Sequence, residues 1–274
     1  MGIQGAAWGT VIAQVIELII YIIVVIKQYN QEYDFFLNVN FPSFAEIKKM
    51  LLLGFPMGVA DSIDIFSFGF LMTFVSRLGT TELAASQIAN QLNDLAFMPS
   101  FAIGAATGSL VGRSLGEKDP DKAEKYGISG IYTGIGIMAI VGILYWVFPA
   151  VFIYPFSSDK DVFELSRKLL RLIAFYQLLD VTYNVLRGAL NGARLTRFTG
   201  LTTTLCVFGV FMPVSYIGVN VLNLGVWGAW LGPIVYGVFL VTILGNKFKK
   251  GEWKEPFKKK VVKQVQTELT FDTN

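Results

Sequence analysis

The sequence predicts an all-α polytopic membrane protein with seven transmembrane helices. Two features of the composition support this fold class: 53% of the 274 residues are hydrophobic, and only 16% are charged. A soluble domain has roughly 25% charged residues, whereas a helix needs about 20 apolar residues to cross a hydrocarbon core about 30 Å thick. Such apolar windows recur along the chain. They predict spans at residues 3–26, 51–75, 83–111, 127–148, 169–190, 199–222 and 226–244.

The rarest residue types exclude several kinds of chemistry. Histidine is absent, and Cys206 is the single cysteine, inside an apolar run. A zinc centre, a Ser-His hydrolase and a disulfide framework are therefore excluded, and neither an enzyme nor a cofactor is expected. The net charge of +3 is concentrated in loops and in the tail, where it reports on membrane topology and not on nucleic-acid binding. Binding chemistry must come from carboxylates, tyrosines and amides.

Basic residues alternate between the two sides of the predicted spans. Of the 23 Lys and Arg residues, 18 lie on one side, in residues 27–50, 112–126, 187–198 and 245–274. The positive-inside rule places this side, and with it the C-terminus, in the cytoplasm at a plasma (inner) membrane. With seven spans, residue 1 then lies outside, at the mouth of the first helix. This favours a chain that begins in the middle of a longer protein, with residues 27–50 as the linker between two halves.

The C-terminal tail is strongly basic. Eight lysines lie between residues 247 and 263, around Trp253 and Phe257. Such a segment can bind anionic lipid headgroups, or it can be a solvated tail that only fixes the topology.

Three predicted spans carry an acid near the middle of the membrane. These acids are Asp64, Asp94 and Asp180. A carboxylate at the bilayer centre costs several kcal/mol, so it is retained mostly where it faces a polar cavity and has a function there. Three such acids on three helices predict a pathway for the coupled transport of an ion and a substrate.

Further polar residues lie on the same helix faces as these acids and form polar stripes with them. The stripe of the third span consists of Gln87, Asn90, Gln91 and Asp94, at i, i+3, i+4 and i+7. The stripe of the fifth span consists of Tyr176, Asp180, Asn184 and Arg187, and Asp61 lies one turn before Asp64 in the second. Polar stripes cannot face lipid, so they either line a cavity or hold neighbouring helices together. Arg187 is close to a helix end and is interpreted as a topological residue that snorkels to the membrane surface.

Asp64, Tyr176 and Asp180 are the candidate cation-binding residues. In a low-dielectric cavity a carboxylate either takes up a proton or keeps its charge beside a cation. Asp64 and Asp180, with backbone carbonyls, could ligate Na⁺, and the Tyr176 hydroxyl or ring could contact an inorganic or an organic cation. Competition between two cations for one site is the basis of antiport. The possible cavity-lining residues are Asp61, Gln87, Asn90, Gln91, Asp94 and Asn184.

Several segments resemble the multidrug and toxic compound extrusion (MATE) family of transporters, and together they cover nearly the whole chain. The similar segments are 2–7 (beginning of the family's sixth helix), 54–58 with Asp64 (seventh helix), 84–116 (eighth helix and following loop), 176–180 and 187–193 (tenth helix) and 225–230 (start of the twelfth helix). Residues 84–116 carry the most specific part of the resemblance.

The resemblance implies one lobe of a two-lobe, twelve-helix transporter. Residues 1–26 would be the last helix of an N-terminal lobe, 27–50 the cytoplasmic linker between the lobes, 51–246 the six-helix C-terminal lobe, and 247–274 the basic cytoplasmic tail. The family exports small organic cations and drugs in exchange for Na⁺ or H⁺, by rocking between outward-open and inward-open states. Its cation site in the C-terminal lobe corresponds to Asp64, Tyr176 and Asp180. The missing N-terminal lobe and membrane lipid are the implied partners.

Two departures and three alternatives accompany this interpretation. Asp64 stands where the family often has Glu, and Arg194 stands where it commonly has Gly. A lipid-linked oligosaccharide flippase of the same superfamily would favour a basic cavity, whereas the acids found here are negative. An inactive, truncated fragment would keep the fold of one lobe without transporting anything. An intramembrane aspartyl protease is not favoured, because neither a Tyr-Asp nor a Gly-x-Gly-Asp motif occurs in a predicted span.

Overall fold

The computed structural model describes residues 2–33 and 43–254, and these segments are helical almost throughout. Within them, seven helical segments are long and apolar enough to cross a membrane. The predicted fold class, an all-α membrane protein with seven spans, is confirmed. The chain divides into two compact units at residues 50 and 51, and each is described by itself.

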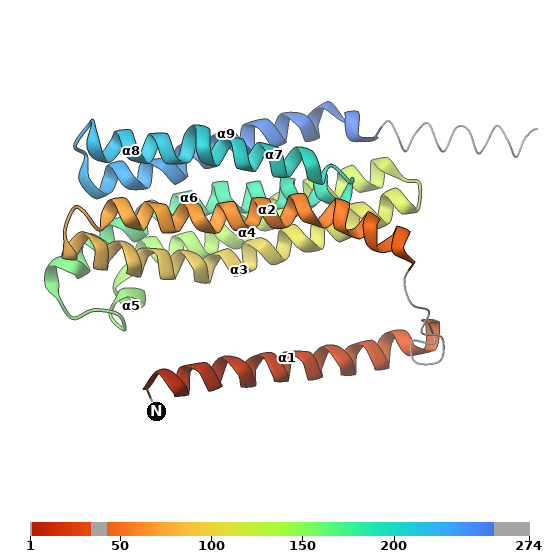
Figure 1. Ribbon diagram of the computed structural model, residues 1–274, viewed down its shortest axis with the longest axis horizontal. Helices are drawn as coiled ribbons and strands as arrows, with labels where there is room; N and C mark the ends of the chain where they lie inside the picture. Colours follow the sequence, from red (N-terminus) through yellow and green to blue (C-terminus); the bar gives the residue numbers. More distant parts are fainter. Residues whose placement is uncertain (1, 34–42, 255–274) are drawn as a thin grey trace, which may run out of the picture. The chain divides into compact units, whose positions relative to one another are not determined.

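The first unit is dominated by α1, Gly2–Tyr33 (Figure 1). Its membrane-spanning part, Ala7–Lys27, has a mean hydropathy of 2.5. A helix that is apolar on all sides is typical of a membrane span. The predicted span at residues 3–26 lies inside α1.

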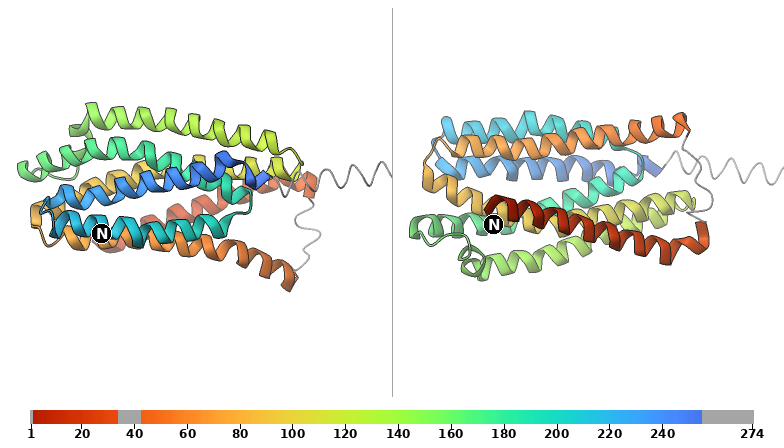
Figure 2. Two further views of the ribbon diagram at one scale, coloured as in Figure 1. Left: turned by 90° about the horizontal axis from the view of Figure 1, so that it is seen from above. Right: turned by 60° about the horizontal axis from the view of Figure 1, so that its bottom comes forward.

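The second unit is a bundle of long helices whose axes run along one direction (Figures 1 and 2). Its elements, with the start of α2 included, are α2 Phe44–Val75, α3 Thr80–Gly116, α4 Pro120–Val147, α5 Pro149–Ile153, α6 Lys160–Gly192, α7 Thr196–Cys206, η1 Val207–Phe211, α8 Met212–Asn220, α9 Gly225–Lys250 and η2 Glu252–Lys254. The segment Thr196–Asn220 forms one span from α7, η1 and α8. At the centre of the bundle, α6 packs against α3, α4 and α9.

The helices extend beyond the spans predicted from hydropathy. With 33 residues, α6 is about 50 Å long at 1.5 Å per residue, well over the thickness of a hydrocarbon core. The start of α2 illustrates the reason, because a capping box begins the helix at Phe44, before the apolar run. The Ser43 backbone N–H donates to the Glu46 carboxylate at 2.8 Å, and the Glu46 N–H donates to the Ser43 hydroxyl at 3.3 Å.

Both ends of the expected linker, residues 27–50, are therefore helical. Residues 27–33 belong to α1, and residues 44–50 belong to α2. The part of the linker at residues 34–42 lies outside the described residues.

The predicted break at residues 116–121 is confirmed as a short turn before α4. The Asp119 carboxylate caps the helix by accepting from the Lys122 N–H at 2.9 Å, and Pro120 occupies the first helical position. Bonds from Lys122 and Arg113, at 2.8 and 3.0 Å, hold the pKa of the Glu117 carboxyl below its ordinary value. These ion pairs are exposed, so they contribute little to stability.

Glycines bring the parallel helices α3 and α6 into backbone contact. A Cβ at Gly104 would lie 2.6 Å from the Asn184 carbonyl oxygen, and one at Gly108 would lie 2.7 Å from the Gly188 carbonyl oxygen. A Cβ at Gly188 would in turn overlap the Gly104 carbonyl. Small residues four apart are typical of close helix packing in membranes, where lipid is as apolar as the side chains and packing must replace the hydrophobic effect. This contact fixes the register of α3 against α6.

The antiparallel helices α8 and α9 are also brought into backbone contact by glycines. Gly218 and Gly228 face each other so closely that a Cβ on either would clash with the other's backbone. Beside this contact the Ser215 hydroxyl donates to the Ala229 carbonyl at 2.9 Å. The ring of Phe211 packs edge-on against Tyr236 of α9 and Phe68 of α2, which joins three helices.

The sixth span contains one turn of π-helix, η1, which sequence patterns did not predict. The Met212 N–H bonds to the Val207 carbonyl, five residues back instead of four. Pro213 follows at once, and it has no N–H to donate. The wider turn gives the chain a way to continue as a helix at a proline.

The chain after α9 folds back onto α4. Gly251 adopts a left-handed conformation, with φ of 68°. The Trp253 indole N–H donates to the Phe248 carbonyl at 2.9 Å, and its ring stacks on Phe248, whose ring covers Gly127. Trp253 is only 3% exposed, so it packs in the protein and does not lie on lipid headgroups. Phe257 and residues 255–274 of the expected tail lie outside the described residues.

Candidate functional site

Asp180 lies at the centre of a hydrogen-bond network between α6 and α3. Its Oδ2 accepts from the Ser100 hydroxyl at 2.8 Å and from the Asn184 side-chain amide at 3.0 Å. The same amide also donates to Ser100 at 3.0 Å. The close glycine contact between the two helices makes these bonds possible, because it brings Ser100 within reach of the acid. Ser100 and Asn184 are buried, and Asp180 is half-buried.

Asp64 is held from the other side of the bundle by α9. Its Oδ1 accepts from the Tyr236 hydroxyl at 2.6 Å, and Tyr236 is 2% exposed. The Ser67 hydroxyl donates to the Asp64 backbone carbonyl at 2.6 Å. Hydrogen bonds to a charged group contribute about 1.5–3 kcal/mol each, so the Tyr236 bond is a strong link between α2 and α9.

The structure brings the three predicted cation-binding residues into one region. Tyr176 is buried on α6, and a Cβ at Gly237 of α9 would lie 3.6 Å from its ring. Asp64 and Asp180 are close enough to interact electrostatically with each other and with the Tyr176 hydroxyl. Two acids and a phenol from α2 and α6 therefore lie within electrostatic range of one another.

Losing the bond between Tyr236 and Asp64 is expected to loosen α2. In a Tyr236→Phe variant the free energy of unfolding should fall by about 1.5–3 kcal/mol, because a hydrogen bond to a carboxylate is removed. Cys206, the single cysteine, is 6% exposed and provides the readout. Its thiol should react with a maleimide dye at a lower temperature in the variant.

Tyr216→Phe is the matched control for this substitution. Tyr216 is 51% exposed on α8, so removing its hydroxyl should leave the labelling temperature unchanged. Equal shifts in the two variants would contradict a specific role for the bond to Asp64.

Arg187 is not a snorkelling residue, and that interpretation was wrong. Its guanidinium forms an ion pair with the Asp61 carboxylate of α2, and it lies 5.9 Å from the centre of the Tyr183 ring. The Tyr183 hydroxyl is hydrogen-bonded to Thr203 at 3.1 Å. The side chain turns inward because an acid on a neighbouring helix is within reach, which helix position alone cannot reveal. The predicted neighbours Asp61 and Asp64 thus have separate partners on separate helices.

The polar stripe on α3 lies on the outer face of the lobe. Gln87, Gln91 and Asp94 are exposed, and Asn90 is half-buried. The Asn90 amide donates to Asp94 at 3.2 Å, and no hydrogen bond joins this stripe to Asp64 or Asp180 in the part of the chain that the structure describes. These residues can line a cavity only on that outer face, so their role remains a prediction.

Sequence patterns missed Ser100, although a signal for it exists. A second face of α3, about a quarter-turn from the stripe, carries small polar residues at a spacing of seven, and all of them are buried. They are Ser86, Asn93, Ser100, Thr107 and Ser114. A spacing of seven corresponds to nearly two helical turns, so it marks one face. Tyr236 carries no such signal, since it is a single aromatic residue in an apolar helix.

Gln177 is a further residue that the sequence analysis missed. It is 2% exposed, it follows Tyr176 on α6, and neither the nitrogen nor the oxygen of its side-chain amide has a hydrogen-bond partner among the described residues. A buried polar group without a partner costs about 1–3 kcal/mol. Gln177 is therefore a candidate contact for a polar ligand near the two acids.

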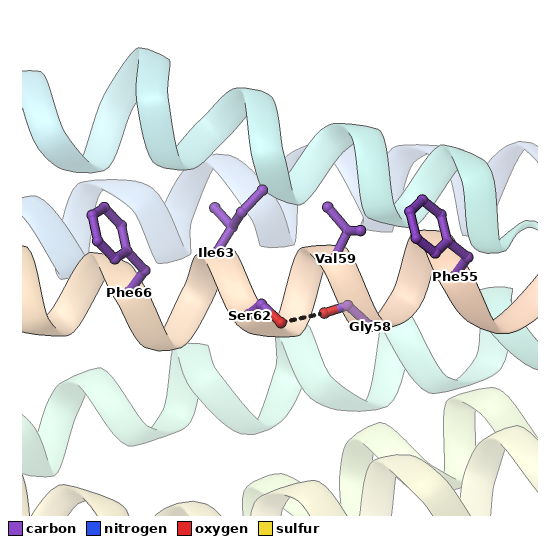
Figure 3. Close-up of a pocket in the computed structure, with 6 residues that line it drawn as sticks. All are labelled: Phe55, Gly58, Val59, Ser62, Ile63 and Phe66. Atoms are coloured by element: carbon purple, nitrogen blue, oxygen red, sulfur yellow. Dashed lines mark hydrogen bonds between the residues drawn. The ribbon is translucent and has the colours of Figure 1, made fainter.

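A shallow apolar hollow of about 600 Å³ runs along α2 (Figure 3). Its lining residues are Phe55, Gly58, Val59, Ser62, Ile63 and Phe66. The apolar side chains recur on one side of the helix, whereas the Ser62 hydroxyl bonds to the Gly58 carbonyl at 2.8 Å. Asp61 and Asp64 do not line this hollow, so it adjoins the acids along α2 without containing them.

The residues around the acids offer a limited set of ligands for Na⁺. In the described segments no group of three or more acidic, cysteine or histidine side chains could hold a metal ion. A hard cation binds oxygen, so hydroxyl, amide and carbonyl oxygens would have to complete a site at Asp64 and Asp180. Asn184 presents its N–H to Asp180, and its amide would have to turn to offer oxygen instead.

Seven apolar helical segments in the described residues, with hydrogen-bonded acids between them, are typical of multi-pass membrane transporters. The family model of MatE matches residues 56–217. The chain belongs to this family, whose members are transporters and not enzymes.

Curated relatives and solved structures agree with this assignment. The probable multidrug resistance protein NorM of Pasteurella multocida is 33% identical over 213 residues, which are 76% of this chain and 46% of that protein. NorM of Thermotoga maritima is 28% identical over 93% of this chain and 54% of its own length. The eukaryotic MATE transporter AtDTX14 has a TM-score of 0.78 at 17% identity, covering 86% of this chain and 53% of that one. An outward-facing multidrug resistance MATE family transporter has a TM-score of 0.76 at 20% identity. The match covers 94% of this chain and 58% of that one.

The chain spans about half the length of the curated relatives that it matches. The likeness to solved structures, at identities of 17–20%, shows the fold.

Proposed function

We propose that the chain forms the C-terminal lobe of a cation-coupled antiporter that exports organic cations and drugs. The observation that carries this proposal is the approach of Asp64 on α2 to Asp180 on α6, with Tyr176 beside them. The relatives named multidrug resistance proteins support the export of drugs. The partner would be an N-terminal lobe, supplied by the same longer protein or by a second chain.

The two acids perform the exchange because they can be neutralised in two ways. Na⁺ or H⁺ at Asp64 and Asp180 cancels the negative charge of the site, and an organic cation does the same. The two cations therefore exclude each other. Alternating access between outward-open and inward-open states then converts this competition into antiport.

The surroundings of Asp180 can accommodate either Na⁺ or H⁺ as the coupling cation. Donors from Ser100 and Asn184 stabilise an ionised carboxylate, which is the form that binds Na⁺. A protonated Asp180 carboxyl would have to donate to the Ser100 hydroxyl oxygen, because the Asn184 group that faces it is an N–H donor. The exposed α3 stripe and the α2 hollow, together with an N-terminal lobe, would supply the remaining contacts to cargo.

A plasma-membrane location with a cytoplasmic C-terminus belongs to the same proposal. The 18 basic residues on one side of the spans support it. A flippase for lipid-linked oligosaccharides is less well supported, because the region contains Asp61, Asp64 and Asp180 against one arginine, and is thus acidic.

Efflux measurements test the proposed function. Cells that express the chain alone, or together with the segment encoded directly upstream, are loaded with ethidium and exposed to an imposed Na⁺ or pH gradient. Gradient-driven efflux in the second strain is the expected result, and the effective gradient identifies the coupling ion. No efflux in either strain would favour an inactive fragment and contradict the proposal.

A further inference from the structure

We propose that Arg187 is a tethered cation that occupies Asp61, and that cargo cations with a planar, delocalised charge bind by displacing it. Asp61 is then a further cation-binding residue, and the cargo class is aromatic amidinium and guanidinium compounds. The inference rests on the proposed function and deepens it.

The positions of the pair relate it to the candidate cation site. Asp61 lies one turn before Asp64 on α2, and Arg187 lies seven residues after Asp180 on α6, which is nearly two turns on the same face. Asp64 interacts electrostatically with both Asp61 and Arg187. The ion pair and the two acids therefore form one continuous charged region between the helices.

Burial of the two partners is unequal, and this makes displacement possible. The Asp61 side chain is 45% exposed, whereas the Arg187 side chain is 9% exposed. A cation that approaches the lobe can thus reach the open side of the carboxylate. Arg187 covers only the inner side, and it can retreat toward Asp64, which also attracts it.

The chemistry of Arg187 indicates the chemistry of the cargo. A guanidinium is planar and weakly hydrated, it matches a carboxylate with two parallel N–H donors, and it interacts with aromatic faces. At this site the guanidinium has both kinds of partner, the Asp61 carboxylate and the Tyr183 ring at 5.9 Å. An aryl amidinium has the same fork and the same delocalised charge, so it can take over the Asp61 carboxylate. A compact, strongly hydrated cation fits these partners less well.

Binding of a fluorescent bis-amidine tests the inference. The chain is reconstituted in phosphatidylcholine nanodiscs, empty nanodiscs are subtracted, and the Kd for 4′,6-diamidino-2-phenylindole is measured by fluorescence. Arg187→Gln frees Asp61, and the Kd should fall by about tenfold, which corresponds to about 1.4 kcal/mol. Adding Asp61→Asn to that variant should reverse the gain. Damage to the fold would weaken binding, so a gain in affinity reports specifically on the release of Asp61.

Arg171→Gln is the matched control. Arg171 is a second arginine of α6; it is half-buried and lies over the Trp146 ring at 5.5 Å, whereas the ion pair of Asp61 is with Arg187. Its substitution should leave the Kd unchanged. Arg187→Lys provides a second variant if Arg187→Gln does not fold, because a lysine pairs with a carboxylate as a point charge and should be displaced more easily than arginine.

The outcomes separate this inference from the proposed function. A Kd that is unchanged or higher in a folded Arg187 variant, while the wild type binds the probe, overturns the inference alone. No binding by the wild type or by any variant overturns the proposed function as well.

Discussion

The Asp180→Asn variant should lose cation-coupled efflux and remain folded. Asparagine has the shape of aspartate, and its amide oxygen can still accept from Ser100 and Asn184, so the contact between α3 and α6 is preserved. The substitution removes the negative charge that a cation requires. The affinity for the coupling cation should fall by about a hundredfold, which corresponds to about 2.7 kcal/mol and lies within the range for a hydrogen-bonded charge.

Transport and folding are measured separately for this variant. Ethidium efflux under a Na⁺ or pH gradient reports on coupling, and Cys206 labelling against temperature reports on folding. Asp161→Asn is the matched control, because Asp161 lies on the same helix in its exposed first turn. Unimpaired efflux in the Asp180 variant would remove Asp180 from the cation site.

The largest effect on stability is expected from Gly188→Leu. A Cβ at Gly188 overlaps the Gly104 carbonyl, so any side chain must push α6 away from α3. Overpacking of this kind costs about 1–3 kcal/mol or more. Separation of the helices should also move Ser100 away from Asp180, and the variant should therefore lose cation binding together with stability.

Gly136→Ala on α4 is the control for the glycine substitution. A Cβ at Gly136 would meet no atom of another helix within 4 Å in the described part of the chain. Alanine in a helix interior is favoured over glycine by about 0.5–1 kcal/mol, so this variant should label at Cys206 at the same or a slightly higher temperature. A Gly188→Leu protein as stable as the wild type would contradict the tight contact between α3 and α6.

The number of spans could be predicted from the sequence, whereas the helix ends could not. Hydropathy detects the part of a helix that lipid must cover, and it therefore locates each span. The start of α2 at Phe44 depends on the capping bonds between Ser43 and Glu46, which lie in a polar stretch. The π-turn at Val207–Phe211 depends on how a proline is accommodated in three dimensions, and hydropathy carries no information about it.

The candidate site was predictable only within single helices. Helical periodicity identified Tyr176, Asp180 and Asn184 as one face of α6, and the structure places them there beside Asp64. Pairings between helices were not predictable, because they depend on how far one helix is displaced along another. The partner of Asp61 illustrates this: Arg187 is 126 positions away in sequence, and only the folded arrangement of the helices brings the two charges together.

Periodicity also did not reveal which face of α3 turns inward. The strongly polar stripe at Gln87, Gln91 and Asp94 is exposed, and the modest stripe that contains Ser100 packs against α6. Strong polarity marks a face that avoids lipid, but it does not distinguish the interior of a lobe from a face reserved for a partner. The roles of Asp64, Tyr176 and Asp180 in cation binding remain predictions that the variants above test.

The π-turn in the sixth span bears on how this segment can change during evolution. One extra residue in a turn amounts to a single-codon insertion in an ordinary α-helix. The wide turn absorbs this residue, so the deletion of one residue from Val207–Phe211 would restore an ordinary α-helix and leave the orientation of α8 unchanged. Ser215 and Gly218 would still face Ala229 and Gly228, and the hairpin of the last two spans would keep its closest contacts. Homologues without the π-turn therefore need no compensating changes on these helices, and they should align with this chain through a one-residue gap.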